Sequence, residues 1–523
     1  MLCGTVAMSY TARMRRTLAM LIVSIAGLST LVGLYLIASS GTGTVIAATT
    51  MPPTTTTASP PPPATTTTTS TTLPFVRFVD PRTVGAAWGT TEGVLQFRGN
   101  PSRTWYGDAN LPSNPEQLWR FPDRMMCGDS SVGGETTTWC GTGWTGQPAV
   151  WVRPDGVTEV VFGAYDKAVH FVDAATGERT RPDFRVGDLI KGSVTIDPDG
   201  YPLLYFGSRD NKLRVVALDR PEPEELWAID AANHPGIWNN DWDGNPSIVE
   251  DIMFEGGENG ILFATKLNRS YDSNGLVQVA PEILAKVEGW NDELLRSVGD
   301  RNASIESSVA ILNGRLYFTN SGGRVVGLDI TRIESGEAPI VFDFWAGDDI
   351  DASPVIDADG MLYLAIELER RLPRAAEIGQ IIKLDPSRPD DPLVWSVAVP
   401  ALNGQSDGGA WATPALGDGV LYAATHTGDL LAIDALTGEV VWSDGIGFHA
   451  WSSPIIVDGH LVLAVDCEAG GGLRAYSLAD PRNPIDAWDL PHGSGCIEST
   501  PTVWDGRIFV GSRDGYFYAF GDR

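Results

Sequence analysis

Eight positions that recur along the sequence carry side chains able to bind a ligand. Each position lies three residues before a proline, or before the residue that replaces it, at the start of a short apolar segment. The residues are Thr145, Lys191, Asp243, Glu306, Asp351, Trp411, Trp451 and Glu498. Carboxylates bind cations, an ammonium group contacts anions, and indoles form apolar walls. If the segments converge, these residues form a ligand-binding mouth; the alternative is a water-filled channel whose side chains bond to water and backbone.

One stretch adds oxygen atoms at alternate positions, WNNDWDGNPS (residues 238–247). Oxygen ligands of this kind suit a hard cation such as Ca²⁺. The candidate metal ligands are Asp241, Asp243, Asn245, Glu306 and Asp351. The stretch is not an EF-hand, because Pro246 and Ile252 stand where that loop needs Gly and Glu. A network of turns is the alternative, and Glu255 and Glu258 in FEGGENG (254–260) join the site only if their segment folds back.

The elements that must position these residues are short strands. After each of the eight positions the sequence runs to a turn, most often Asp-Gly or Asn-Gly, and then through two apolar strands separated by a second turn. Most units add a fourth strand that ends in Trp, and successive units begin 40–63 residues apart. Four-stranded antiparallel units repeated at this interval predict an all-β fold, an eight-bladed β-propeller.

The two ends of the propeller are predicted to meet in one blade. The last unit stops at Arg523 after three strands, whereas EQLW (116–119) resembles an outer strand with nothing ahead of it. Pairing of Gln117–Phe121 with Tyr516–Phe520 would close the ring and leave no open sheet edge. Tryptophans at the ends of outer strands are expected to dock between blades: Trp119, Trp227, Trp345, Trp395, Trp442 and Trp488.

One unit is specific enough to indicate a family. AIDALTGEVVW (432–442) resembles the tryptophan-docking motif of PQQ-like (quinoprotein alcohol dehydrogenase-like) propellers, and residues 217–227 and 171–181 keep parts of it. The resemblance covers about residues 95–523 and implies eight blades, as in quinoprotein alcohol dehydrogenases and in the outer-membrane-assembly lipoprotein propellers. In the dehydrogenases, PQQ and its Ca²⁺ occupy the region of the mouth. The adjacent Cys-Cys pair of those enzymes is absent from this sequence, as is a haem motif.

Charge and hydropathy divide the chain into parts. The formal net charge of −29 repels phosphate backbones, so nucleic acid is not an expected partner. Residues 18–38 are an apolar run long enough to span a bilayer, and the arginines before it place residues 1–17 in the cytoplasm. Residues 39–94 are predicted to be a disordered Thr/Pro-rich linker and 95–523 the extracytoplasmic propeller. Cleavage near 45–50, which would secrete the protein, is the alternative.

The four cysteines beyond the apolar run are expected in an oxidising compartment, where disulfides persist. The shortest closures pair Cys127 with Cys140 and Cys467 with Cys496, although three connectivities are open. Insertions at 266–304, 367–379 and 467–472 are expected in rim loops that carry binding. Within the first, residues 282–295 are the best candidate for a short helix.

The sequence is compatible with two functions. The first is a binding, scaffold or sensor module of the cell envelope, held in the membrane by one N-terminal helix, with its rim loops contacting an envelope protein or polymer. The alternative is a PQQ- and Ca²⁺-dependent quinoprotein dehydrogenase that oxidises alcohols or sugars. The catalytic residues of those enzymes cannot be placed one by one on this sequence, and the first function is therefore preferred.

Overall fold

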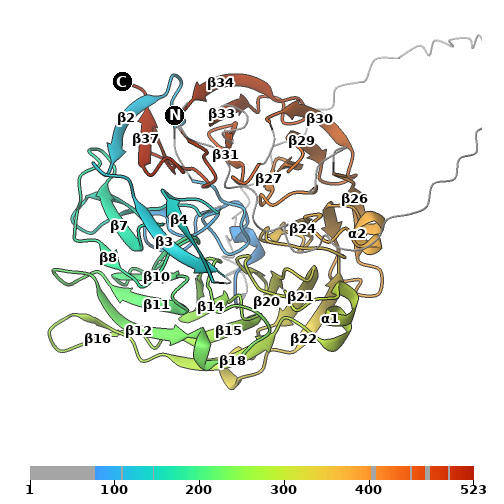
Figure 1. Ribbon diagram of the computed structural model, residues 1–523, viewed down its shortest axis with the longest axis horizontal. Coiled ribbons are helices and arrows are strands. Elements are labelled where there is room, and N and C mark those ends of the chain that lie inside the picture. Colours follow the sequence, from blue (N-terminus) through green and yellow to red (C-terminus); the bar gives the residue numbers. More distant parts are fainter. Residues whose placement is uncertain are drawn as a thin grey trace, which may run out of the picture. The chain divides into compact units, whose positions relative to one another are not determined.

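The structure is a computed structural model that describes residues 77–523 except 108–109, 133, 145, 402–407, 448–449, 466–470 and 493–494. The described residues form eight antiparallel sheets arranged as blades around one axis (Figure 1). The predicted eight-bladed β-propeller is therefore confirmed. Among the described residues no helix is long and apolar enough to cross a membrane. The predicted spanning segment 18–38 lies outside them.

Blades 1–4 follow each other along the chain, and each runs from the axis outward. Blade 1 contains β1 (Gly93–Val94), β5 (Ala149–Val152), β6 (Thr158–Ala164), β7 (Ala168–Asp173) and β8 (Phe184–Arg185). Blade 2 contains β9 (Thr195–Ile196), β10 (Leu203–Gly207), β11 (Lys212–Ala217) and β12 (Glu224–Asp230). Blade 3 contains β13 (Ser247–Val249), β14 (Ile252–Gly256), β15 (Ile261–Lys266) and β18 (Glu282–Glu288). Blade 4 contains β19 (Ala310–Leu312), β20 (Arg315–Thr319), β21 (Arg324–Asp329) and β22 (Ile340–Trp345).

Blades 5–8 repeat this order. Blade 5 contains β23 (Val355–Ile356), β24 (Leu362–Ala365), β25 (Ile381–Leu384) and β26 (Leu393–Val397). Blade 6 contains β27 (Ala415–Gly417), β28 (Val420–Ala424), β29 (Asp429–Asp434) and β30 (Val440–Gly445). Blade 7 contains β31 (Ile455–Val457), β32 (His460–Val465), β33 (Gly472–Ser477) and β34 (Ile485–Pro491). Blade 8 contains β35 (Thr502–Trp504), β36 (Arg507–Gly511), β37 (Phe517–Gly521) and β2 (Glu116–Phe121).

The eighth blade is completed by the N-terminal strand β2, as predicted. β2 pairs antiparallel with β37, with Trp119 opposite Ala519 and Phe121 opposite Phe517. The two partners are far apart in sequence but adjacent in the ring (Figure 1). This pairing fixes both ends of the propeller in one sheet.

Hydroxyl groups also join the blades next to the axis. After six of the eight mouth positions, the residue two places along accepts a hydrogen bond from the backbone N–H of the blade before it, at 2.9–3.3 Å. These acceptors are Ser193, Ser308, Ser353, Thr413, Ser453 and Thr500. The Ser/Thr before the repeated proline is therefore an inter-blade contact that satisfies a buried backbone donor.

Residues 95–106 form a segment, here called the plug, that lies along the axis among the first strands. Its backbone carbonyls accept hydrogen bonds from Ile196, Ile311 and Ile356, which belong to blades 2, 4 and 5. Arg98 and Arg103 are fully buried in it, and their guanidinium groups donate to carbonyls of blades 4 and 6. The plug therefore occupies part of the axis between the blades.

The outer strands show where docking residues must stand. In blades 2–8 the pairing of the outer strand with the third strand shifts register once, at a β-bulge or irregularity. The residue that follows this shift holds the equivalent register position in each blade. The indole N–H groups of Trp119 and Trp395 donate at 3.1 Å to Ala174 and Ala435 of the next blade. Trp227, Trp442 and Trp488 stand at equivalent register positions.

Trp345 does not dock in this way. Phe342 follows the bulge in blade 4, and Trp345 lies three residues further along. Its indole donates at 3.0 Å to Gly322 of its own blade. The sequence ends this strand in Trp, as in the other blades, but it does not show where the bulge falls.

Two further boundaries differ from the prediction. Residues 282–288 form strand β18, since Ile283, Ala285 and Val287 alternate with polar residues, and only α1 (Asp292–Val298) is helical. Residues 77–94, assigned to the linker, pack on the propeller: Phe78 is fully buried among residues of blade 4. The segment also contains η1 (Pro81–Thr83) and β1, so the folded part begins before residue 95.

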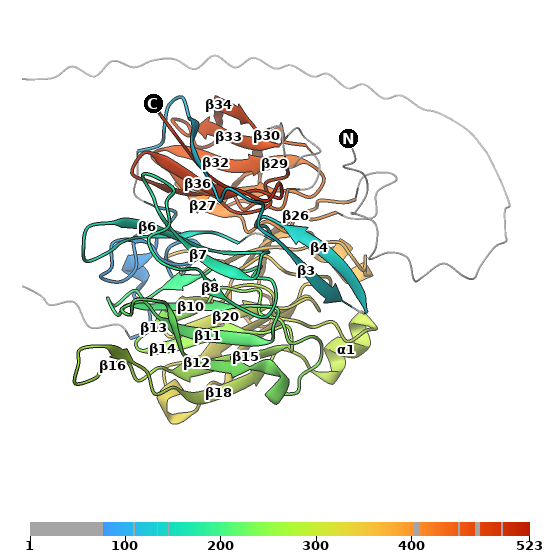
Figure 2. The ribbon, with the colours of Figure 1, turned by 60° about the vertical axis from the view of Figure 1, so that its left-hand side comes forward.

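The insertions lie on both faces of the ring. The mouth face is defined as the face on which the first strands begin and the turns between second and third strands lie. It carries α1, α2 (Pro373–Ile378) and the hairpin of β3 (Cys127–Val132) with β4 (Glu135–Cys140). The hairpin of β16 (Ser270–Tyr271) with β17 (Val277–Gln278) follows a third strand and therefore lies on the opposite face (Figure 2). Short 3₁₀ turns η2 (Ala231–Asn233) and η3 (Ile333–Ser335) follow β12 and β21.

The disulfide predictions are settled for one pair. Cys127 and Cys140 are bonded across the first residues of the β3–β4 hairpin, with an S–S distance of 2.03 Å. Cys496 is also disulfide-bonded. Its predicted partner Cys467 lies outside the described residues.

Candidate functional site

The predicted mouth residues gather on the mouth face. Asp243, Glu306 and Asp351 line an axial cavity, and Phe97 of the plug lines it as well. The remaining wall residues are Gly146, Gly192, Ser193, Ser308, Ser353 and Thr413, which belong to the start of the first strands. Thr145 lies outside the described residues. The cavity is therefore polar and lies between the plug and the carboxylates.

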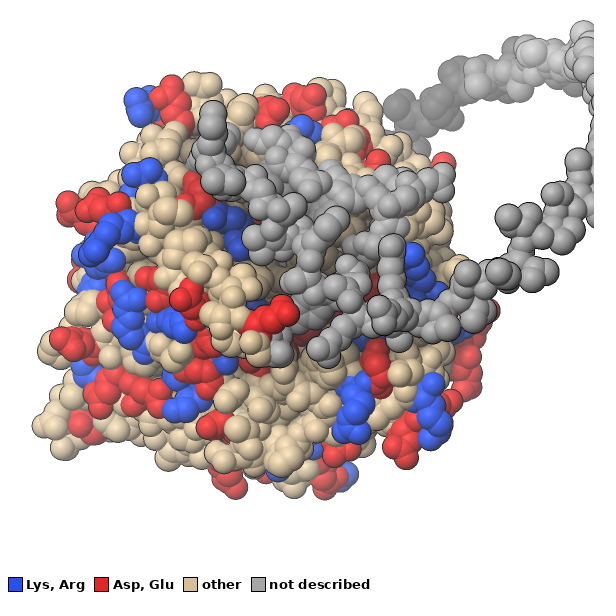
Figure 3. Space-filling model, viewed as in Figure 1, with Lys and Arg blue, Asp and Glu red and all other residues tan. Residues whose placement is uncertain are grey.

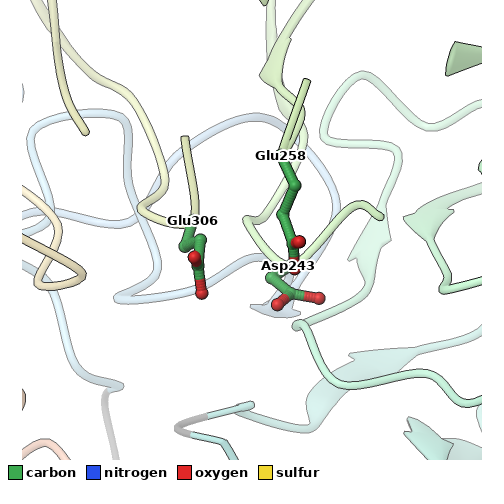
Figure 4. Close-up of side chains that lie close together, drawn as sticks. All are labelled: Asp243, Glu258 and Glu306. Carbon is green, nitrogen blue, oxygen red and sulfur yellow. The ribbon is translucent and has the colours of Figure 1, made fainter. Parts of the chain in front are cut away.

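Three carboxylates converge beside this cavity. Asp243, Glu258 and Glu306 each offer an oxygen, and these oxygens lie within 4.8 Å of one another (Figure 4). The ammonium group of Lys191 forms an ion pair with Asp243 and lies 3.6 Å from a carboxylate oxygen of Glu258. We call Lys191 and these three carboxylates the mouth cluster.

Burial and charge shift the pKa values in the mouth cluster. Burial raises the pKa of Glu258 well above its usual value, and repulsion from Asp243 adds to it. Burial and the nearby Asp351 raise the pKa of Glu306 to about 8. Burial alone would lower the pKa of Lys191, but the three carboxylates outweigh it and raise that pKa. The mouth cluster therefore holds a firmly charged lysine and carboxyl groups that compete for protons.

Aromatic side chains form the other part of the mouth. The rings of Trp411 and Trp451 have centroids 3.8 Å apart, and Trp144 lies 5.3 Å from Trp451. Lys191 Nζ lies 4.5 Å from the centroid of Trp144, close enough for a cation–π contact. The aromatic rings thus contact one another and the lysine.

Glu498, the last mouth residue, is paired. Its carboxylate lies 2.9 Å from the guanidinium of Arg513, which also lies over the rings of Trp139 and Tyr165. Arg513 Nε donates to the carbonyl of Cys140. Glu498 therefore helps to hold the base of the β3–β4 hairpin on the mouth face.

The candidate metal ligands of residues 238–247 do not converge. Asp241 pairs with Arg209 at 2.6 Å, and Asp243 pairs with Lys191. The Asn245 side chain accepts from the backbone N–H of Phe97 at 2.9 Å and donates to Thr195. Asp241 and Asn245 thus have partners elsewhere, whereas Asp243 belongs to the mouth cluster.

Four further mouth residues were not predicted from the sequence, apart from Glu258, which was a conditional candidate. They come from the turn between the second and third strands of a blade, which returns to the mouth face: Arg209, Glu258, Glu367 and Arg513. For Glu258 the sequence FEGGENG indicated this position, because its glycines allow the chain to turn back toward the mouth. Its N–H donates to the carbonyl of Asp241 at 2.9 Å.

Comparison with known sequences places part of the ring in a family. The family model described as outer membrane protein assembly factor BamB, a PQQ-like model, matches residues 378–488, from the end of α2 to the docking Trp488. The chain carries PQQ-like propeller repeats. The resemblance read from AIDALTGEVVW is thereby confirmed.

Curated relatives of this PQQ-like propeller are of two kinds. BamB of Yersinia pestis is 28% identical over 113 residues, which are 20% of this chain and 25% of that protein. Quinoprotein ethanol dehydrogenase of Pseudomonas putida is 30% identical over 93 residues, 17% of this chain and 14% of that enzyme. The chain thus matches a quarter or less of the length of either relative.

Solved structures support the fold of the PQQ-like propeller. A quinohemoprotein alcohol dehydrogenase from Pseudomonas putida superposes with a TM-score of 0.53 at 10% identity, covering 82% of this chain and 80% of that one. The enzyme from Comamonas testosteroni gives 0.51 at 13% identity with the same coverage. At these identities the likeness shows the fold alone.

The residues of this PQQ-like propeller fit poorly with a PQQ–Ca²⁺ pair at the mouth cluster. The Lys191 ammonium group already lies against Asp243 and near Glu258, where a divalent cation would otherwise be held. Trp411 and Trp451 are in contact with each other, so a planar ring system cannot enter between them. No catalytic step is therefore derived through that cofactor.

Proposed function

We propose that this chain is an extracytoplasmic binding module of the cell envelope, whose mouth face contacts an envelope protein or polymer. The observation that carries the proposal is the β3–β4 hairpin, which stands on the mouth face with a disulfide at its base. A disulfide of this kind persists outside the cytoplasm. A covalently closed hairpin also loses less conformational entropy when a partner binds it.

The proposal includes a tether. Residues 1–17 would remain in the cytoplasm, residues 18–38 would span the membrane, and the Thr/Pro-rich residues after them would hold the propeller away from it. Cleavage after the apolar run would instead release the same module. The partial match to BamB, a protein named for outer membrane assembly, supports a role in the envelope.

The charge of the mouth face fits a protein or polymer partner better than nucleic acid. On the face seen in Figure 3, Lys and Arg side chains are interspersed with Asp and Glu around the rim. Nucleic-acid-binding domains gather basic side chains into one patch or stripe. The partial match to quinoprotein ethanol dehydrogenase makes alcohol oxidation the alternative, against which the position of Lys191 weighs.

Site-specific photocrosslinking in cells tests the proposal. A photoreactive amino acid at Thr136, exposed on the β3–β4 hairpin, is expected to give a discrete crosslinked adduct. The matched control is Ser273, exposed on the hairpin of the opposite face, which should give none. Equal adducts from both positions, or none from Thr136, would contradict the assignment of the mouth face.

A second assay addresses the alternative. Purified full-length protein is supplied with PQQ and CaCl₂, and dye reduction is followed with ethanol or glucose as substrate. We expect no turnover above a sample that lacks PQQ. Reproducible alcohol-dependent turnover would replace the binding module by the dehydrogenase.

A further inference from the structure

A second group of carboxylates lies on blade 5, next to the mouth cluster, and includes the mouth residue Asp351. Asp349 and Asp351 precede β23, and Glu367 follows β24. Each offers an oxygen, and the three oxygens lie within 4.8 Å of one another. Only 4% of Asp349 and 2% of Glu367 is exposed. We call these three residues the blade-5 cluster.

One buried oxygen of each carboxylate in the blade-5 cluster lacks a hydrogen bond. Within the described part of the chain no donor reaches Asp349 Oδ1, Asp351 Oδ1 or Glu367 Oε1. A buried acceptor left in this state destabilises the fold, and more so if it is charged. Burial also raises the pKa of all three carboxyl groups well above their usual values, and repulsion adds to this effect, from Glu369 for Asp349, from Asp349 for Asp351, and from Asp351 for Glu367.

The nearby arginine does not compensate for these oxygens. Arg370 Nη1 lies 3.4 Å from the other oxygen of Asp349, but it donates at 2.6 Å to the carbonyl of Ser321. Its remaining nitrogens donate to Asp300 and to the carbonyl of Asn302. In the mouth cluster a lysine ammonium lies among the carboxylates, whereas among the described residues no lysine pairs with the blade-5 cluster.

The backbone holds the blade-5 cluster in place. The N–H of Glu367 donates at 2.9 Å to the carbonyl of Asp349, so the two segments that supply the carboxylates are tied to each other. Glu367 also forms a β-bridge with Gly409. The spacing of the oxygens is therefore fixed before any ligand arrives.

We propose that Asp349, Asp351 and Glu367 bind Ca²⁺. Ca²⁺ lies about 2.3–2.6 Å from each oxygen ligand, so oxygens on opposite sides of the ion are roughly 5 Å apart. The spacing within the blade-5 cluster falls inside this limit. Three carboxylates supply enough negative charge for a divalent ion, and Ca²⁺ tolerates irregular geometry that Mg²⁺ does not.

Isothermal titration calorimetry on the full-length, EDTA-treated protein tests the site. The wild type is expected to bind one Ca²⁺ per chain, and CaCl₂ at about 1 mM, the range of extracellular Ca²⁺ modules, should raise its unfolding temperature. Asp349→Asn and Glu367→Gln should each weaken binding about tenfold or more. The control Asp390→Asn, an exposed carboxylate of the same blade, should bind as the wild type does.

The variants remain informative if one of them folds poorly. Glu367→Gln removes a repelling charge and keeps the side-chain shape, so in EDTA it should be at least as stable as the wild type. Absence of Ca²⁺ binding by the wild type would overturn the proposal, as would equal binding by wild type and Glu367→Gln. Stabilisation by MgCl₂ equal to that by CaCl₂ would overturn the choice of ion.

Discussion

The substitution Trp119→Ala tests how the ring is closed. Trp119 is 9% exposed, and its ring lies 6.0 Å from Phe509 and 6.3 Å from Phe517, between centroids. It also packs on Gly177 of blade 1, where the φ angle is +71° and a Cβ would lie 2.6 Å from the indole. The side chain therefore connects the last blade to the first.

The expected cost follows from these contacts. Replacing a buried tryptophan by alanine costs about 3–5 kcal/mol, and the hydrogen bond to Ala174 accounts for about 0.5–1.5 kcal/mol of it. If this loss falls on the pairing of β2 with β37, local opening becomes easier. At about 1.4 kcal/mol for each factor of ten, the amides of Phe517–Gly521 should exchange about a hundredfold faster or more.

Hydrogen exchange followed by mass spectrometry measures the exchange rate of the amides in each segment of the chain. The matched control is Trp395→Ala, which removes the same kind of indole contact at Ala435 and Gly438 inside the ring. It should accelerate exchange in blade 5 and leave β37 protected. The reasoning is refuted if β37 keeps its protection in Trp119→Ala, or if both variants expose it equally.

Two further predictions concern the mouth face. Because the pKa of Glu306 is raised from 4.5 to about 8, its contribution to stability is present at low pH and is lost as pH rises through this window. Glu306→Gln should therefore reduce the fall in unfolding free energy between these pH values, by at most about 1.4 kcal/mol per pH unit; parallel urea-unfolding profiles would contradict this. Replacing Cys127 and Cys140 by Ser should cost the hairpin about 3 kcal/mol and speed exchange in Gly128–Trp139 while the blades keep their protection; accelerated exchange throughout the ring would show that the disulfide supports more than the hairpin.

The blades could be predicted because their signals are local. Asp-Gly turns, two-residue alternation and a terminal Trp are each visible within a few residues of sequence. The closing strand at Trp119 could be predicted because the N-terminal end of the propeller has one strand too many and the last unit has one too few. The different register position of Trp345 could not be predicted, because the bulge that Phe342 follows depends on pairing with a neighbouring strand.

The site was predicted only in part for the same reason. The first-strand positions Asp243, Glu306 and Asp351 recur in sequence and meet at the cavity. Glu258 and Glu367 come from a second series of turns whose residue types vary from blade to blade. The role of the plug escaped detection because the partners of Arg98 and Arg103 are more than two hundred residues away.

The plug has a consequence for how the chain folds during synthesis. Its residues are made early, but the carbonyl of Val309 and that of Thr413, to which its arginines donate, are made much later. Contacts of such sequence separation form slowly. The plug gains partners from blades 2, 4 and 5 as these are made, but Arg98 reaches the carbonyl of Thr413 only when blade 6 exists, and β2 must wait for β37. The N-terminal part of the folded domain is thus among the last to be placed, so the ring is completed only after the whole chain has been made.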